Sequence, residues 1–205
     1  MNSQKPSLLI IGHPKGLTTQ TWLACQKVAE LRIPSQTSAG EILNHDRSKE
    51  IKRFNFFDKS EECYDACKEI LDRHLLGWLV KDVVQPHAVC RYITEHPGAF
   101  RVLFIDRDPV IVHWRQSFVW PMGLDDDPAD NIEMFRNASD AVLTFEDVTE
   151  NPPAVWDALR NLGYAITEVD YIDAEFRRIR RLQKEKLQEF NLRAAQRAED
   201  NLKEQ

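Results

Sequence analysis

The sequence predicts an α/β fold with a mainly parallel central sheet of about four to five strands, flanked by helices. Two observations predict it. Short apolar runs that are typical of buried strands alternate along the chain with segments of helical spacing. The 205 residues are 42% hydrophobic and 29% charged, which is typical of a globular chain with a core. No repeat or linker divides the chain, so we expect one domain over residues 1–205, with a charged helical segment at about 171–205.

Apolar runs that end at turn residues predict the strands, at residues 7–11, 78–84, 101–106 and 141–145. Helices are expected between and after them. Thr18 or Thr19 is expected to cap the first, which would end near residues 31–34. Further helices are expected over residues 60–76, from Pro86, after Pro109, around residues 132–137, and over residues 152–162 with Gly163 as the stop.

Composition restricts the partners and the compartment. A net charge of −6 argues against a broad nucleic-acid surface, and the apolar runs are too short to span a membrane. We therefore expect a cytoplasmic protein without nucleic-acid partners, and a homodimer is left open. The four cysteines form no C-x-x-C pair. Cys63 and Cys67 would share one helix face, where buried, reduced thiols are favoured over zinc or a disulfide.

Polar side chains gather where three predicted strands end. Because ligands bind outside the carboxyl ends of parallel strands, cationic groups from separate segments are expected to converge there on one anion. The residues are Lys15, Thr18 and Thr19 after the first strand, Lys81 and Asp82 in the second, and Arg107 and Asp108 after the third.

The stretch GHPKGLTTQ, residues 12–20, has the composition of a phosphate-binding turn. Gly16 would let the backbone approach an anion, Lys15 adds a charge, and the amides at a helix N-terminus favour negative groups. The Walker A pattern is absent, because Lys15 precedes the glycine. An ordinary strand-to-helix turn is the alternative.

Several segments together resemble the sulfotransferase family. PKGLTTQTWL resembles the 5′-phosphosulfate-binding loop, usually written PKSGTT, and EHPGAFRVLFIDRDPVIVHWRQSF resembles the 3′-phosphate-binding strand and helix. LVKD resembles the strand between them, and AVLTFEDV with WDALRNLGY resembles a later strand and helix. The resemblance covers about half of the chain. It implies a P-loop-like architecture and the cofactor 3′-phosphoadenosine 5′-phosphosulfate (PAPS).

Carried over by position, the resemblance assigns cofactor-binding roles. Lys15, Gly16, Thr18 and Thr19 would hold the 5′-phosphosulfate, and Lys81 would lie near the transferred sulfuryl group. Arg107 would hold the 3′-phosphate, together with Arg115 or Ser117. Two departures stand out: Gly16-Leu17 replaces the family's Ser-Gly, and Arg115 replaces its serine. Trp22 and Trp114 are candidates for stacking on adenine, and core packing is the alternative.

Transfer to a hydroxyl or amine also needs a base. Glu41 follows Gly40 as in the glutamate-using relatives, and His87 follows the second strand near the position of the histidine in others. Glu41 is favoured over His87. The implied function is a sulfotransferase acting on a small-molecule or glycan acceptor. A nucleotide-dependent kinase on a related fold and a non-catalytic nucleotide-binding or scaffold relative remain alternatives.

Overall fold

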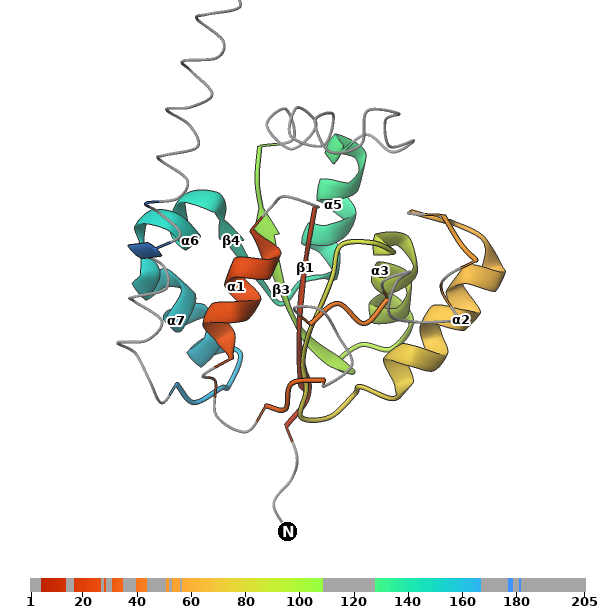
Figure 1. The fold of residues 1–205 in the computed structure, drawn as a ribbon, viewed down its shortest axis with the longest axis horizontal. Helices are drawn as coiled ribbons and strands as arrows, with labels where there is room; N and C mark the ends of the chain where they lie inside the picture. The colour runs from red at the N-terminus through yellow and green to blue at the C-terminus, as the bar shows by residue number, and fades with distance from the viewer. Residues whose placement is uncertain are drawn as a thin grey trace, which may run out of the picture.

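The computed structural model shows an α/β fold built on a four-stranded, all-parallel sheet (Figure 1). It describes residues 5–13, 17–26, 28, 31–34, 40–43, 51, 53–55, 57–108, 128–166, 177–178 and 181. The spatial order of the strands is β2-β1-β3-β4. Their bounds are Ser7–Gly12 for β1, Leu79–Asp82 for β2, Phe100–Asp106 for β3 and Ala141–Thr144 for β4.

Helices cover both faces of the sheet, as the alternating pattern predicted. Helices α1, α6 and α7 lie on one face, and α2, α3 and α5 lie on the other (Figure 1). Their bounds are Thr18–Cys25 for α1, Glu61–Asp72 for α2, Pro86–Glu95 for α3, Pro128–Ala138 for α5, Phe145–Glu150 for α6 and Pro152–Asn161 for α7.

Two apolar clusters form the core, one on each face. Successive strand side chains point to opposite faces, so Leu8 and Ile10 pack with α1 and α7, whereas Leu9 and Ile11 pack with α2, α3 and α5. Every residue of β1 is buried. The run from Leu8 to Ile11 is apolar without a break, as is expected of a strand inside a parallel sheet with both faces covered.

The strand order has a switch point between β1 and β3, where the connections begin to lead to the opposite side of the sheet. From β1 the chain passes through α1 and α2 to β2 on one side, whereas from β3 it passes through α5 to β4 on the other side. The chain therefore leaves the adjacent carboxyl ends of β1 and β3 toward opposite sides of the sheet. In open parallel sheets this switch point is the usual place for a ligand crevice.

The structure corrects the expected start of the first helix. The N-cap of α1 is Leu17, in the left-handed conformation with φ 72° and without a side-chain cap, so the expected Thr18 or Thr19 cap is wrong. Both threonines instead begin the helix. The helix also ends at Cys25, earlier than expected, and Val28 beyond it forms an antiparallel bridge with Ile166.

The strand expected at residues 141–145 is one residue shorter. Thr144 and Asp147 form a capping box, in which each side chain accepts the other residue's backbone N–H, and Phe145 therefore begins α6. Helix α2 begins after Ser60 as expected but ends at Asp72.

Two expected helix boundaries are confirmed, and others fall outside the described part. Pro86 opens α3, and Gly163 follows α7 with φ 89°. The helix expected after Pro109 lies outside the described residues, as does the C-terminal segment apart from Arg177, Arg178 and Arg181. Within the described ranges, no helix combines the length and apolarity needed to cross a bilayer.

Candidate functional site

The described site residues cluster at the carboxyl edge of the sheet. His13 follows β1, Lys81 and Asp82 end β2, and Arg107 follows β3. Thr18 and Thr19 open α1. The remaining predicted cofactor-binding residues lie outside the described residues; they are Lys15, Gly16, Arg115 and Ser117.

A close backbone approach joins the end of β1 to the start of α1. A Cβ on Gly12 would lie 2.9 Å from Thr18 Cγ2 and 3.1 Å from the carbonyl oxygen of Ile105 in β3. Glycine therefore allows the first turn of α1 to rest against both central strands. Thr18 is buried there and Thr19 is partly exposed.

Arg107 places a buried cation just beyond β3. Its exposed fraction is 6%, and its guanidinium carbon lies 4.1 Å from the ring centroid of Phe145. The register explains this contact, because Asp106 pairs with Thr144 and the next residues of the two segments are Arg107 and Phe145. Asp106 itself bonds Arg136 of α5 at 2.7 Å. Arg107 thus lies on the aromatic face of the neighbouring segment.

Glu41 and Lys81, both predicted near the chemistry, form an ion pair with each other. The exposed fractions of the residues are 3% and 4%, so the pair is buried. The second carboxylate oxygen of Glu41 accepts the backbone N–H of Val83 at 3.1 Å. Each charge is therefore compensated inside the protein.

Gly40 and Trp22 hold Glu41 beside β2. The carbonyl oxygen of Gly40 accepts the N–H of Lys81 at 2.9 Å, so this segment runs parallel to the outer edge of β2. Gly40 has φ 79°, and a Cβ there would lie 2.0 Å from Trp22 Nε1. The Trp22 indole donates to the carbonyl of Leu79 at 3.0 Å. Trp22 is thus a buried core residue, which is the core-packing alternative that the sequence left open beside stacking on adenine.

Asp82 is a second buried carboxyl at the end of β2. Its exposed fraction is 1%, and its oxygens accept the backbone N–H groups of Val84 and Gln85 at 3.2 to 3.3 Å. Burial, followed by the nearby charge of Glu41, raises the pKa of Asp82 well above its usual value, although the two N–H donors oppose the shift. Its proximity to Glu41 was not predicted from the sequence.

Two histidines follow strands of the sheet, His13 after β1 and His87 at the start of α3, and His87 is the other predicted base. His87 is the second residue of α3 and is partly exposed, whereas His13 is buried with its ring centroid 5.1 Å from that of Phe135. No group of three or more potential metal ligands occurs among the described residues. Cys63 and Cys67 are buried as expected, and their sulfurs lie 3.9 Å apart with no disulfide bond between them.

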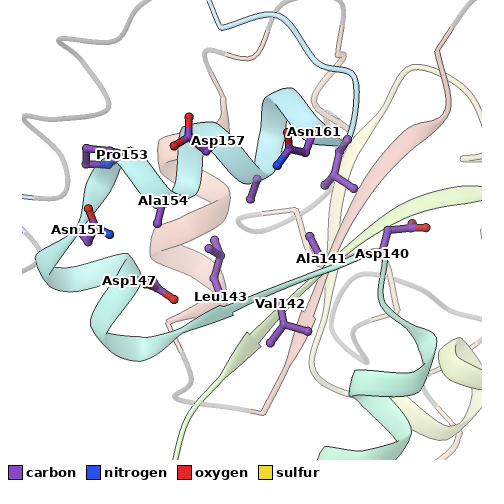
Figure 2. Close-up of a pocket in the computed structure, with 12 residues that line it drawn as sticks. Asp140, Ala141, Val142, Leu143, Asp147, Asn151, Pro153, Ala154, Asp157 and Asn161 are labelled. Atoms are coloured by element: carbon purple, nitrogen blue, oxygen red, sulfur yellow. The ribbon is translucent and has the colours of Figure 1, made fainter.

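A separate concavity lies beside the edge strand β4, under α6 and α7 (Figure 2). None of the predicted site residues lines it. Its acidic residues serve the fold: Asp140 accepts the N–H of Val102, Asp147 belongs to the α6 capping box, and Asp157 pairs with Arg160. We therefore place the candidate site at the carboxyl edge of the sheet.

Comparison with known proteins assigns neither a family nor a function to the chain. No protein-family model matches the chain, and no curated protein matches it. The site therefore has to be interpreted from its own residues.

Proposed function

We propose that this protein is a sulfotransferase that moves a sulfuryl group from PAPS to a hydroxyl or amine. The observation that carries the proposal is the buried guanidinium of Arg107 beyond β3, at the switch point of the sheet. A cation in this position suits a phosphate, because guanidinium groups bind phosphate oxygens in pairs of hydrogen bonds.

The residues present fit a doubly phosphorylated nucleotide. Arg107 would hold the 3′-phosphate, while the turn after β1 and the first residues of α1, Thr18 and Thr19, would hold the 5′-phosphosulfate. The close approach at Gly12 gives the start of α1 a fixed position against the sheet. PAPS would supply the activated sulfuryl group, and Lys15 would stabilise charge on the leaving phosphate.

The base remains the less defined part of the proposal. Glu41 is buried in its ion pair with Lys81, so a base at this position would have to give up that contact to reach the acceptor. His87 is partly exposed and is the other candidate. Both Glu41 and His87 are therefore candidate bases in this proposal. The acceptor is a small molecule or a glycan.

The same ion pair favours a second candidate function, a non-catalytic nucleotide-binding protein of the same fold. Two groups proposed to act in catalysis, Glu41 and Lys81, neutralise each other in the interior. A protein that only binds the nucleotide would need Arg107 and the start of α1, and could use the pair for stability alone.

Binding and turnover experiments separate these functions from each other and from a kinase. Calorimetry with adenosine 3′,5′-bisphosphate, AMP and ATP tests the nucleotide class. We expect the bisphosphate to bind more tightly than AMP by at least ~1.5 kcal/mol, the scale of one charge-assisted contact. Equal affinities contradict the proposal, and a preference for ATP supports the kinase. Labelled PAPS with a panel of phenols, sugars and amines then tests turnover, and its absence supports the non-catalytic function.

A further inference from the structure

The aromatic ring beside Arg107 has no role in the function proposed above. Phe145 is only partly buried and is the first residue of α6. Its ring centroid is 4.1 Å from the guanidinium carbon of Arg107, which is within the range of a cation–π contact. The ring therefore contacts the one described cation that we assign to phosphate binding.

Two independent features fix this ring beside the arginine. The parallel register of β3 and β4 ends with Asp106 opposite Thr144, so Arg107 and Phe145 leave the sheet side by side. The capping box of Thr144 and Asp147 then fixes the backbone on which Phe145 stands. The contact is thus determined by the sheet and the helix start.

We propose that Phe145 is a positioning residue, whose ring supports the guanidinium of Arg107 so that its N–H donors are directed at a phosphate of the bound nucleotide. This inference rests on the proposed function. A guanidinium is planar, and a ring against it restricts its orientation without using its donors. Binding then loses less side-chain entropy when the hydrogen bonds to phosphate form.

The first test is the selectivity of Phe145 variants for the 3′-phosphate. Phe145→Leu removes the ring and keeps an apolar side chain, whereas Phe145→Tyr keeps an aromatic face. We expect Phe145→Leu to weaken adenosine 3′,5′-bisphosphate binding by about 2- to 30-fold, the range of a cation–π contact, with AMP binding almost unchanged. Phe145→Tyr should retain the wild-type preference.

A matched control comes from the other end of the sheet. Arg32 lies over Trp78 with the same 4.1 Å separation, just before β2 begins. Trp78→Leu removes an arginine–aromatic contact of equal separation at the amino end of β2, and should leave the ratio of the bisphosphate and AMP affinities unchanged. A similar loss in both variants would overturn the specific role of Phe145.

The outcomes separate this inference from the function on which it rests. A wild-type protein that does not prefer the bisphosphate overturns both. A wild-type preference that survives in Phe145→Leu overturns the positioning role alone. If Phe145→Leu does not fold, Phe145→Met is used with the same criterion.

Nuclear magnetic resonance of the nucleotide-free protein gives a readout without ligand. The side-chain protons of Arg107 should show a ring-current shift in the wild type and in Phe145→Tyr, and lose it in Phe145→Leu or Phe145→Met. An unchanged Arg107 signal in the variants that lack the ring would overturn the inference.

Discussion

Glu41 and Lys81 form an ion pair in which both side chains are almost fully buried, although the two residues are 40 positions apart in the sequence. Their segments are joined by a backbone hydrogen bond from the N–H of Lys81 to the carbonyl oxygen of Gly40. Removing one partner leaves an uncompensated charge in the interior, which is costly. Two residues of the candidate site therefore also hold the Glu41 segment against the edge of β2.

Single removal of either partner should be strongly destabilising. We expect Glu41→Leu and Lys81→Met each to lower the free energy of unfolding by about 3–5 kcal/mol, and the double variant to cost less than the sum, because both charges are then gone. Urea unfolding of the four proteins measures this. Losses below ~1 kcal/mol in both single variants would show that the pair is solvent-accessible in solution.

Asp82 should make stability depend on pH. Because its pKa is raised in the folded protein, its stabilising contribution is complete below the pKa of an unperturbed aspartate, about 3.9, and is lost as the pH rises through the folded pKa. Asp82→Asn keeps an acceptor for the Val84 and Gln85 N–H groups without this titration. Its stability relative to the wild type should therefore increase with pH above about 4.

Urea unfolding of the wild type and Asp82→Asn across the acid to neutral range checks this expectation. Glu95→Gln provides a comparison with the opposite sign, because hydrogen bonds from Arg91 and Tyr64 lower the pKa of the exposed Glu95. A stability difference between wild type and Asp82→Asn that does not change with pH would mean that Asp82 ionises normally.

Gly40 should tolerate no side chain. Gly40→Ala combines a φ of 79° with a Cβ 2.0 Å from the Trp22 indole nitrogen, so we expect a loss of at least ~2 kcal/mol and a change in tryptophan fluorescence. Gly163→Ala is the matched control, since Gly163 has φ 89° and open space at its Cβ. It should cost only about 1 kcal/mol. Equal losses would contradict the close contact with Trp22.

Arg107 should discriminate between nucleotides. Arg107→Ala is expected to weaken binding of adenosine 3′,5′-bisphosphate much more than binding of AMP. The two losses of binding free energy should differ by about 1.5–3 kcal/mol, the scale of hydrogen bonds to charged groups. Calorimetry measures both affinities and thermal unfolding checks the fold. A collapsed melting transition with no specific loss would assign Arg107 to structure alone.

Lys15 should matter more for turnover than for binding. If it stabilises the leaving phosphate, Lys15→Ala should slow single-turnover sulfuryl transfer by about 10²–10³ while cofactor affinity falls less. Lys15→Arg should rescue poorly, because a planar guanidinium does not replace a compact ammonium. Wild-type turnover in Lys15→Ala would remove the proposed catalytic role of this loop.

The sequence predicted the sheet well because its signal is local. Apolar runs located all four described strands, and Pro86 and Gly163 marked helix ends through their own backbone preferences. The prediction of a threonine cap for α1 was wrong because it used the local pattern alone. The N-cap is Leu17, which is buried by tertiary packing in the left-handed conformation.

The side-chain partners in the candidate site could not be predicted in the same way. Glu41 and Lys81 were both expected near the chemistry, but Glu41 lies in a segment without clear periodicity, so their ion pair could not be predicted from the local pattern. The Arg107–Phe145 contact depends on the register of β3 and β4, which the apolar runs do not specify. The contacts that decide the chemistry are therefore long-range consequences of the fold.

The strand β1 precedes both of its sheet partners, β2 and β3, by many residues in the sequence. Leu8 pairs with Leu79 on one side and with Arg101 on the other, so neither edge can be satisfied by a nearby hairpin. Non-local pairing of this kind is slow to form. The apolar run SLLIIG therefore stays without its native partners until these later segments are made, and an unpaired apolar segment of this kind is prone to aggregation during folding.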